Sequence, residues 1–471
     1  MNKDIPLGLS FDDVLIVPGY SKVVTRKLID LKTNFSKNIR LNIPVVSANM
    51  DTVTESPMAI AMAREGGIGI IHRFMPLEKQ INEVHKVKRS EALVISDPVT
   101  VSPNIGLAEL RHILAIHEIS SVLVTDKENI LKGIVTARDI RFCNGGSLKV
   151  SDIMTPRAKL VTADPNIKKE EAISILEKYK IEKIPLVDKK GVVQGLITAA
   201  DFTKTSKHTR AAKDRRGRLL VGAAIGVNDG EDRAAKLVKV GVDALVVDIA
   251  HGHHRGVIRL IKALKKKYEN VDIIAGNVAT AAGVEDLAKA GADAVKVGIG
   301  PGRACSTRIV AGAGVPQFSA VKECVRVGKR LGVPVIADGG IKNSGDLAKI
   351  IGAGASTAMI GSLFSGTKES PGEYFIEDGV AFKIYRGLAS LDASLDRSLL
   401  EADTARRERA AEGISTRVAY RGDVAVIIKM LIDGLQSGMS YSGASDIQQF
   451  WHKVKFVRIT EAGMRESRPR P

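Results

Sequence analysis

The chain of 471 residues lacks the features on which secreted, membrane-spanning and disulfide-stabilised proteins depend. Its three cysteines, Cys143, Cys305 and Cys324, show no Cys-x-x-Cys pair and no disulfide-framework spacing, so we expect a reducing compartment. The N-terminus has no charged-then-apolar signal pattern, and no apolar run is long enough to cross a bilayer. These absences predict a soluble, cytoplasmic protein that does not contact a membrane.

Aromatic residues are also scarce, at 4% of the chain, whereas the formal net charge is +17. A basic chain can bind nucleic acid, but base stacking needs aromatic side chains, and no RNA-binding motif is present. The basic residues are spread along the chain, with local clusters at 204–218, 262–267 and 406–409. We therefore expect a small anionic ligand rather than specific nucleic-acid binding.

Glycine, in contrast, is abundant, with 44 residues, and the apolar segments follow a strand-then-helix rhythm. Short buried strands are predicted at 43–51 and 68–73, separated by a helix at 57–64. Further strand patterns follow at 219–224, 244–248, 272–275, 294–297, 333–337 and 358–360. Helical patterns separate them at 231–240, 256–268, 283–290, 319–331 and 344–351. Eight strands alternating with helices predict an α/β fold, a (β/α)8 TIM barrel formed by residues 1–90 and 206–471. The alternative is a doubly wound sheet, which calls for a Gly-x-Gly-x-x-Gly turn that follows no early strand here.

Between the two barrel segments the sequence repeats itself. Residues 98–105 (PVTVSPNI) match 160–167 (LVTADPNI), and 133–140 (GIVTARDI) match 195–202 (GLITAADF), at an offset of 62 residues (160 − 98 and 195 − 133). We therefore predict an inserted domain at 91–205, with modules at about 91–148 and 149–205. Each module ends on a Thr-x-x-Asp helix start, Thr136 with Asp139 and Thr198 with Asp201. These residues are either helix caps or ligands of a nucleotide, and the residues alone leave both interpretations open.

The stretch around Cys305 is the densest chemical signal in the chain. It follows an apolar strand pattern and reads KVGIGPGRACSTR over 296–308, so glycines and a proline force a tight turn. Glycines let backbone N–H groups approach a ligand closely. A cysteine near Lys296 and Arg308 could have a lowered thiol pKa and act as a nucleophile, although a lone cysteine is often a small apolar filler. The glycines and basic flanks favour the nucleophile.

Polar residues collect where the predicted strands end, and in a parallel barrel these ends meet at one face. They lie at 47–51 (SANMD), 72–73 (HR), 248–252 (DIAHG), 276–277 (GN), 338–340 (DGG) and 361–362 (GS). Glycine-rich late loops that precede helix N-termini are suited to phosphate binding. Asp338, directly before two glycines, can accept hydrogen bonds from a ribose diol. These positions together predict a nucleotide site.

Segment 300–308 (GPGRACSTR) resembles the catalytic-cysteine loop of the IMP dehydrogenase/GMP reductase family, whose members carry out redox chemistry at carbon 2 of a purine nucleotide. The resemblance extends over almost the whole chain. It includes 7–13 (LGLSFDD), 248–252, 336–340 (IADGG), 367–372 (TKESPG), 385–387 (YRG) and 456–463 (FVRITEAG). The insert resembles a tandem of CBS modules, called a Bateman domain.

The resemblance implies a role for each matching residue. Cys305 would form a covalent thioimidate with purine carbon 2, assisted by Thr307. The substrate nucleotide would contact Ser47, Arg303, Asp338, Gly339, Gly340, Gly361, Ser362, Tyr385, Arg386, Gly387, Leu388, Ala389 and Glu412. The NAD cofactor would contact Asp248, Asn277, Gly298, Ile299 and Gly300. A potassium ion would be held by Gly300, Gly302 and Cys305, together with Glu461, Ala462 and Gly463 of a neighbouring subunit, which implies a homotetramer. In the insert, Thr136, Asp139, Thr198 and Asp201 would bind an adenine or guanine nucleotide.

Two positions depart from the family's pattern. Dehydrogenases activate water with an Arg-Tyr pair on a flap, whereas here Arg397 is followed by Ser398. Arg303 stands where the family usually has a phosphate-binding serine. Three functions stay open: an NAD-dependent IMP dehydrogenase that makes XMP, a GMP reductase that uses NADPH, and a nucleotide-binding regulator without turnover. Overall similarity favours the dehydrogenase, whereas the missing tyrosine favours the reductase. Arg73 argues against the reductase, because reductases have lysine at that position.

Overall fold

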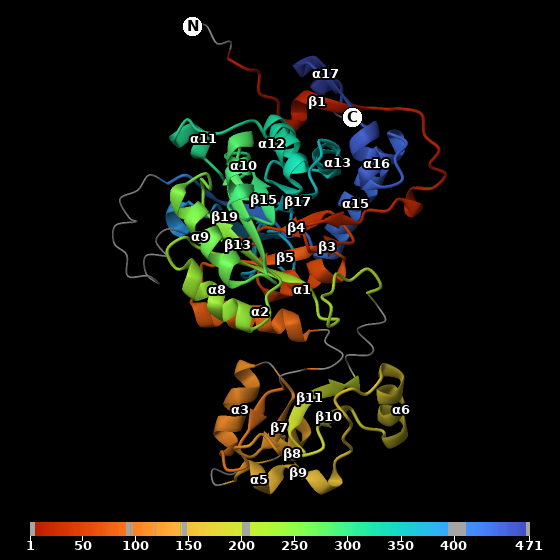
Figure 1. Cartoon of the computed structure of the whole chain (residues 1–471), viewed down its shortest axis with the longest axis vertical. Coiled ribbons are helices and arrows are strands. Elements are labelled where there is room, and N and C mark those ends of the chain that lie inside the picture. The colour runs from red at the N-terminus through yellow and green to blue at the C-terminus, as the bar shows by residue number, and fades with distance from the viewer. Residues whose placement is uncertain are drawn as a thin grey trace. The chain divides into compact units, whose positions relative to one another are not determined.

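The computed structural model describes residues 5–90, 95, 98–117, 119–141, 143, 148–199, 208–393 and 411–467. The chain divides into two compact units (Figure 1). Unit 1 comprises Met1–Lys88, Arg210–Arg215 and Leu219–Pro471, and unit 2 comprises Arg89–Thr209 and Arg216–Arg218. The inserted segment expected at 91–205 thus falls within a unit of its own.

Unit 1 is built on a closed parallel barrel, which confirms the predicted (β/α)8 fold. Around the barrel the strands follow the order β12-β13-β14-β15-β16-β17-β4-β5, so the segments before and after the insert join edge to edge. Their bounds are β4 (Val45–Ser47), β5 (Ile68–Ile71), β12 (Val221–Ile225), β13 (Ala244–Asp248), β14 (Asp272–Val278), β15 (Ala294–Val297), β16 (Val335–Asp338) and β17 (Thr357–Ile360).

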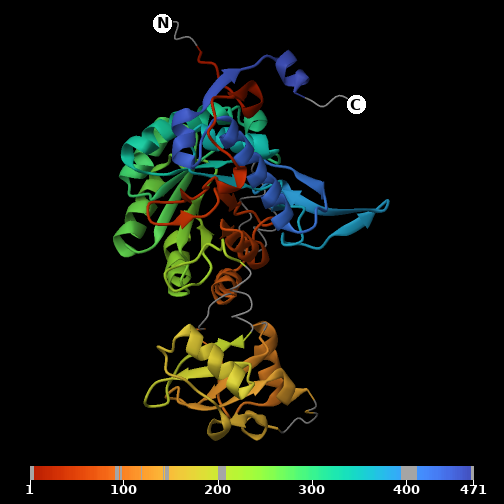
Figure 2. The ribbon, with the colours of Figure 1, turned by 90° about the vertical axis from the view of Figure 1, so that its right-hand side faces the viewer.

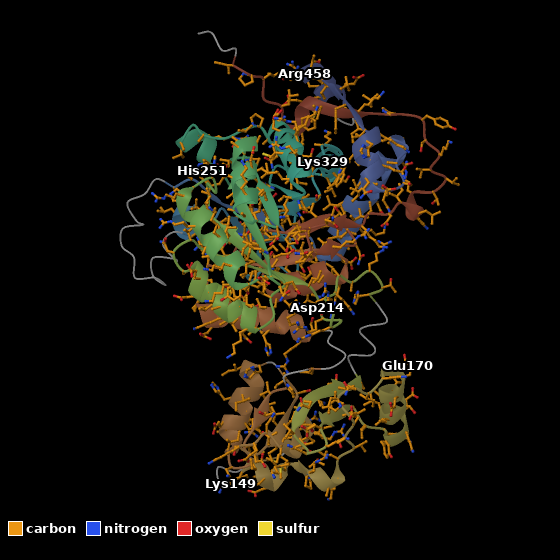
Figure 3. All side chains as sticks on the ribbon, viewed as in Figure 1. Lys149, Glu170, Asp214, His251, Lys329 and Arg458 are labelled. Carbon is orange, nitrogen blue, oxygen red and sulfur yellow. The ribbon has the colours of Figure 1, made fainter. Side chains whose placement is uncertain are left out.

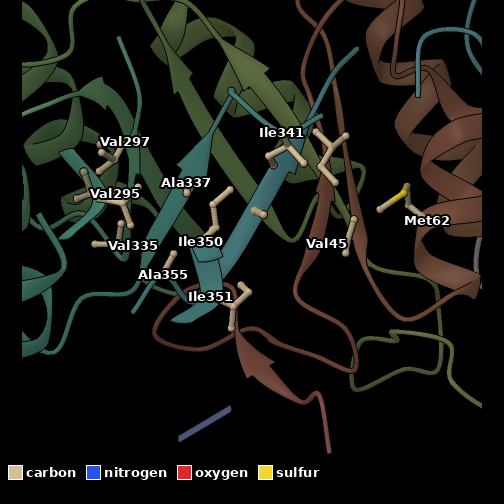
Figure 4. Packing of buried hydrophobic residues seen from close by; sticks show 14 of the residues in the cluster. Val45, Met62, Val295, Val297, Val335, Ala337, Ile341, Ile350, Ile351 and Ala355 are labelled. Atoms are coloured by element: carbon tan, nitrogen blue, oxygen red, sulfur yellow. The ribbon is translucent and has the colours of Figure 1, made fainter. Parts of the chain in front are cut away.

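The barrel strands are apolar on both faces because each strand is covered on both sides. Alternate residues such as Val46, Val246 and Ile336 fill the barrel interior. Their neighbours, including Val295, Val335 and Ala337, pack outward against helices, where Ile350 and Ile351 of α13 (Ser344–Gly352) meet them (Figure 4). Because the eight strands run parallel, each polar residue that follows a strand lies at the same end of the barrel.

The covering helices lie around the barrel (Figures 1 and 2). They are α1 (Ser56–Arg64), α2 (Leu77–Arg89), α8 (Gly230–Lys239), α9 (Arg255–Lys267), α10 (Ala281–Lys289), α12 (Gln317–Leu331), α13 and α15 (Val424–Tyr441). Local signals define several of their ends. The side chains of Thr280 and Asn343 accept backbone N–H bonds in the first turns of α10 and α13. Gly332 ends α12 in the left-handed region, at φ 64°.

Further elements of unit 1 surround the barrel. A short hairpin, β2 (Thr33–Asn34) with β3 (Arg40–Leu41), inserts Phe35 and Leu41 into the interior cluster. A three-stranded antiparallel sheet consists of β18 (Phe375–Glu377), β19 (Val380–Arg386) and β20 (Ser415–Ala419). Strand β1 (Val14–Val17) pairs with β21 (Lys455–Arg458). Along the chain, β21 follows α16 (Ile447–Lys453) and precedes α17 (Glu461–Glu466). Shorter helical segments are η1 (Phe11–Asp13), η2 (Arg26–Leu28) and α11 (Thr307–Val310).

Unit 2 contains the predicted repeat. In its first half, α3 (Leu107–Ile116), β7 (Ser121–Thr125) and β8 (Leu131–Thr136) follow β6 (Thr100–Val101); in its second half, α6 (Lys169–Tyr179), β10 (Lys183–Val187) and β11 (Val193–Thr198) recur. The strands β7 and β10 begin 62 positions apart (183 − 121), as do β8 and β11 (193 − 131). The first half also holds α4 (Ala137–Ile140), α5 (Val150–Ile153) and β9 (Thr155–Pro156), and η3 (Arg157–Lys159) follows. Each half thus contains a helix followed by two strands in the same order.

In the described part of the chain, no helix has the length and apolar character that crossing a membrane requires.

Candidate functional site

A cavity of about 1300 Å³ opens where the barrel strands end. Its walls include the loops that follow β4, β5, β12, β13, β15, β16 and β17, together with Asn277 on β14. In parallel barrels, this end of the strands carries the binding and catalytic side chains. The polar strand ends predicted to converge are therefore brought to one cavity.

Cys305 lies on the cavity wall, on the loop between β15 and α11, and its side chain is exposed. Its Sγ atom is 3.2 Å from the Thr307 hydroxyl oxygen, to which the thiol donates. The backbone N–H of Cys305 donates to the Gly302 carbonyl at 3.0 Å, which closes a tight turn. An accessible thiol on a backbone-constrained turn is suited to attack a ligand in the cavity.

A distant segment holds the cysteine loop in place. The N–H of Ser306 donates to the Glu412 carbonyl, and the N–H of Ile414 donates to the Ala304 carbonyl, each at 3.0 Å. Cys305 itself forms an antiparallel bridge with Gly413. The segment 412–414 therefore extends the loop as a short strand would and brings Glu412 to the cavity wall.

The two cations expected beside the thiol have other partners. The Lys296 ammonium bonds to the Asn277 side-chain oxygen and lies 3.0 Å from Asp338 Oδ2. The Arg308 guanidinium donates to the carbonyls of Ile299 and Val315, at 3.4 and 2.5 Å. Each cation is thus held by another group, because Lys296 pairs with the Asp338 carboxylate and Arg308 stabilises the loop.

Asp338 is the centre of a polar cluster at the base of the cavity. Its Oδ2 atom accepts from Asn277 Nδ2 at 2.8 Å and from Lys296. Its backbone carbonyl accepts from Gln317 Nε2 at 3.0 Å. A Cβ atom at Gly298 would lie 2.0 Å from that carbonyl, so only glycine permits β15 to approach β16 here. The carboxylate is thereby fixed at the cavity wall.

The turns that follow β16 and β17 expose backbone to the cavity. Gly339 and Gly340 both have positive φ, at 90° and 83°, so two successive glycines are needed in the first turn. Gly361 and Ser362 form the start of the second turn and also line the cavity. Such glycine turns present N–H groups to a bound anion.

Tyr385 reaches the cavity from β19, a strand outside the barrel. It is 3% exposed, and its hydroxyl lies 3.8 Å from the Met50 sulfur. Burial, with the Asp338 carboxylate nearby, raises the pKa of Tyr385, so its hydroxyl stays a neutral donor. Gly387 follows on the same chain segment, and a Cβ there would meet the Ala304 carbonyl at 2.6 Å. The antiparallel sheet thus forms one side of the site.

Asp248 and Arg73 form another wall. The Arg73 Nε atom lies 3.6 Å from Asp248 Oδ2 but is buried without a hydrogen-bond acceptor among the described residues. The guanidinium also lies over the Phe74 ring, 4.9 Å from its centroid. An unsatisfied buried donor at a cavity wall indicates a ligand with an acceptor oxygen.

The structure brings most of the predicted site residues to this one cavity. Those that line it are Gly298, Ile299, Gly300, Gly302, Arg303, Cys305, Thr307, Asp338, Gly339, Gly340, Gly361, Ser362, Tyr385, Gly387, Leu388, Ala389, Glu412, Asp248 and Asn277.

Several predicted residues lie elsewhere. Ser47 is fully buried behind the wall, with its hydroxyl 2.9 Å from that of Thr54. Arg386 pairs with Asp51 through an Nη2–Oδ2 distance of 2.6 Å. Both are absent from the described lining, so direct contact of their side chains with a ligand there is not supported. Residues Glu461, Ala462 and Gly463 are on α17, also away from the cavity lining. Arg397 and Asp201 lie outside the described residues.

In unit 2, Thr136 and Asp139 form a capping box at the start of α4. Asp139 Oδ2 accepts from the Thr136 N–H at 2.7 Å and from its hydroxyl at 2.8 Å. The helix-cap interpretation is therefore satisfied for this pair. Thr198 ends β11 at the equivalent position.

Sequence reasoning gave no role to some cavity residues. Arg73 is expected as a polar strand end and as a departure from the reductase pattern but has no assigned contact, and the loop 226–229 after β12 and Arg233 on α8 have no expected role. All three positions follow barrel strands, so their place in the strand-helix order was the signal that could have identified them.

Comparisons with known proteins agree on one family. A family model described as "IMP dehydrogenase / GMP reductase domain" matches residues 8–470. The inosine-5'-monophosphate dehydrogenase of Aquifex aeolicus is 51% identical, covering 99% of this chain and 96% of the relative. That of Bacillus subtilis is 47% identical, covering 98% and 95%. Among solved structures, a cysteine-to-alanine variant of GMP reductase from Trypanosoma brucei, in complex with guanosine 5'-monophosphate, superposes with a TM-score of 0.90 at 44% identity, covering 100% of both chains.

Proposed function

Because this chain belongs to the IMP dehydrogenase/GMP reductase family, we propose that it is an IMP dehydrogenase, which oxidises IMP to XMP with NAD. The observation that carries the chemistry is the exposed Cys305 thiol on the wall of a cavity that also contains Asp338 and the glycine turns. The direction of the reaction is supported by relatives of that name, which are 47–51% identical over nearly the whole chain.

In the proposed reaction Cys305 acts as the nucleophile. The thiolate sulfur adds to carbon 2 of the hypoxanthine ring, and carbon 2 then loses its hydride. A bound NAD would be the acceptor of this hydride. Water next attacks the thioimidate at carbon 2, the carbon–sulfur bond breaks, and XMP leaves with the thiol regenerated. The Thr307 hydroxyl, 3.2 Å from the sulfur, positions the thiol.

The nucleotide's phosphate and ribose would be held by the deep side of the cavity. Asp338 can accept from the ribose hydroxyls, and the turns containing Gly340, Gly361 and Ser362 present backbone donors to the phosphate. The neutral Tyr385 hydroxyl adds one donor. Arg303, which is exposed on the cysteine loop, supplies a positive charge where the family usually has serine. The base would lie against a further set of lining residues, Gly339, Gly387, Leu388, Ala389 and Glu412.

The residues fit an NAD cofactor. The cavity of about 1300 Å³ exceeds the roughly 300–1,000 Å³ of most single-ligand sites, which leaves room for two molecules. The Arg73 Nε atom needs an acceptor oxygen, and Asp248 beside it can bind a hydroxyl. Asn277, Gly298, Ile299 and Gly300 would face the nicotinamide end.

Potassium would occupy the cysteine loop. Gly300, Gly302 and Cys305 lie on the one loop between β15 and α11, and carbonyl oxygens such as theirs are the ligands that hard cations prefer. Residues Glu461, Ala462 and Gly463 lie on α17 of the same chain, away from this cavity, so a neighbouring subunit would complete the ion site. We therefore propose a homotetramer whose subunits share the ion.

GMP reductase is the second candidate. It is favoured by the absence of a tyrosine after Arg397, because reduction of GMP needs no water-activating Arg-Tyr pair, and by the structural similarity to the Trypanosoma brucei enzyme. If the chain is a dehydrogenase, Arg397 acts without that tyrosine as the base that activates water.

Unit 2 would be a CBS tandem that binds an adenine or guanine nucleotide and regulates the barrel. The support is the repeat of strand, helix and Thr-x-x-Asp at 62-residue spacing. Asp139 would have to exchange its capping bonds for ligand bonds, at a cost of about 1 kcal/mol. Binding of ATP or GTP to the full chain, lost in Asp139→Ala, would support this role, whereas unchanged binding in that variant would remove Asp139 from it.

The direction is tested with two substrate pairs. Purified protein is incubated with IMP plus NAD and, separately, with GMP plus NADPH, and the absorbance of the reduced nicotinamide is followed. We expect it to rise with IMP plus NAD. A decrease with GMP plus NADPH and no change in the first mixture would establish the reductase, and silence in both would leave the nucleotide-binding regulator.

A further inference from the structure

A second cavity, of about 350 Å³, lies at the opposite end of the barrel. Its wall includes Val333 and Pro334, which precede β16, and Ser356, which precedes β17, whereas the first cavity lies beyond the ends of these strands. No residue lines both cavities among those described. Its size falls within the roughly 300–1,000 Å³ range of small-molecule sites.

Three further elements line this cavity. From the hairpin come Lys32, Thr33, Asn34 and Arg40, and Asn34 and Arg40 are directly paired across β2 and β3. Helix α12 contributes Val325, Gly328, Lys329 and Gly332, and α16 contributes Ile447, Gln448 and Trp451, both at helical spacings of three and four. Because the hairpin, α12 and α16 all contribute to its wall, this cavity is a concave site and not a flat surface.

The charge of the cavity is of one sign. Lys32, Arg40 and Lys329 line it, and no aspartate or glutamate does so among the described residues. None of the three cations has a carboxylate partner within the described part of the chain. A lysine in the last turn of α12 is favoured by the helix dipole alone, but that effect does not bring two hairpin cations to the same cavity.

Trp451 supplies the observation that points to a ligand. Its indole Nε1 atom is buried and has no hydrogen-bond acceptor among the described residues. The Lys329 ammonium lies over the same ring, 4.7 Å from its centroid, and burial lowers the pKa of Lys329. An unsatisfied indole donor beside the exposed Lys329 ammonium favours an anion.

We propose that this cavity binds a phosphate-bearing small molecule at a site separate from the catalytic one. Phosphate provides several acceptor oxygens and about two negative charges, which match three cations, the indole N–H and the amides of Asn34 and Gln448. The apolar part of the wall, Val325, Val333, Pro334, Val335 and Ile447, can cover an organic group attached to the phosphate. Lys329 is labelled in Figure 3.

The chain contains a single tryptophan, so its fluorescence reports on this cavity directly. The full-length protein is titrated with inorganic phosphate and with butyl phosphate, and with sodium chloride at matched ionic strength. We expect a saturable change in emission with both phosphates, with tighter binding of butyl phosphate, and no saturation with chloride. Equal affinity for the two phosphates would overturn the organic-group part of the proposal, and a response that chloride reproduces would overturn the site.

Two variants test whether phosphate binds in this cavity. Lys329→Gln and Arg40→Gln should each weaken phosphate affinity by about tenfold or more, since each removes a charged donor. Arg326→Gln is the matched control, because Arg326 is on the same helix with its side chain 74% exposed and does not line the cavity. Wild-type affinity in both cavity variants, with thermal unfolding unchanged, would contradict the proposal. The result is independent of IMP or GMP turnover, so it succeeds or fails separately from the proposed function.

Discussion

Asn277 on β14 donates a hydrogen bond to Asp338 on β16, past the intervening strand β15, with 2.8 Å between Nδ2 and Oδ2. The same amide donates to the Gly298 carbonyl at 2.7 Å, and the Lys296 ammonium bonds both side chains. The residue proposed to face the cofactor is therefore tied to the residue proposed to hold the ribose. This link fixes the two ligands' positions relative to each other before either binds.

The first prediction concerns this cluster. Asp338→Asn removes the carboxylate partner of Lys296, whose side chain is 3% exposed, and should destabilise the protein by about 3 kcal/mol while raising the KM for the nucleotide. Urea unfolding and initial rates measure the two effects. Asp433→Asn is the control, because Asp433 pairs with Lys429 on an exposed helix face and should cost less than about 0.5 kcal/mol. Equal losses in the two variants would show that the cluster has no special role.

The second prediction concerns thiol reactivity. Cys305 is exposed, whereas Cys324 is buried and its burial raises its pKa to about 12. The neutral thiol of Cys324 should therefore resist iodoacetamide at pH 8 while Cys305 is alkylated first, and bound IMP should slow the labelling of Cys305. Peptide mass spectrometry identifies the site, with protein unfolded in urea as the control in which all three cysteines react. Preferential labelling of Cys324 would contradict the structure.

The third prediction is a pH dependence of stability at Glu55. Burial acts to raise the pKa of this carboxyl, but hydrogen bonds and charge from His72 and Lys79 outweigh burial and lower the pKa from 4.5 to about 2. A depressed pKa stabilises the folded state above pH 4.5, and that contribution is lost as the pH falls toward 2. Glu55→Gln should therefore cost about 1 kcal/mol at pH 7, after allowance for solvent screening.

Urea unfolding at several pH values measures this effect, and the difference between wild type and Glu55→Gln should shrink between pH 4.5 and 2. Glu78→Gln serves as the control, because Glu78 is 77% exposed in its pair with Lys236. A difference that does not change with pH would mean that Glu55 acts through packing instead of charge.

The fourth prediction concerns potassium. Replacing K⁺ by Na⁺ in the assay should lower turnover by about tenfold or more, because the smaller ion fits the carbonyls of the cysteine loop poorly. Glu461→Ala should have the same effect in K⁺ buffer and little further effect in Na⁺ buffer. Thr460, which caps α17, is left intact so that the helix is retained. Full activity of Glu461→Ala in both buffers would remove α17 from the ion site.

Much of the barrel follows from local sequence patterns, since buried parallel strands read as short apolar runs. The predicted strands 244–248 and 294–297 coincide with β13 and β15. The polar residues after the strands were found for the same reason, because strand ends and helix starts are local features. Asp338 and Cys305 therefore share one cavity, as the alternation predicts.

The remainder of the site depends on contacts between distant segments. The pairing of Cys305 with Gly413 and that of Tyr385 with Thr416 have no local signature, since the two partners in each pair are far apart in sequence. Ser47 is expected at the site both as a polar strand end and from the family resemblance, yet its hydroxyl lies 2.9 Å from that of Thr54 and it does not line the cavity. Strand pairing and side-chain direction are set by tertiary packing, and short-range patterns do not encode them.

The most direct test of the central claim is to trap the bond to Cys305. Protein mixed with IMP and NAD is quenched within a turnover and digested, and the peptide that contains Cys305 is weighed. We predict a nucleotide adduct on Cys305 that requires both IMP and NAD, and a loss of turnover of more than about 10³-fold in Cys305→Ser, with IMP still bound. Turnover in Cys305→Ser at the wild-type rate, or an adduct located on Cys143 or Cys324 instead, would contradict the account.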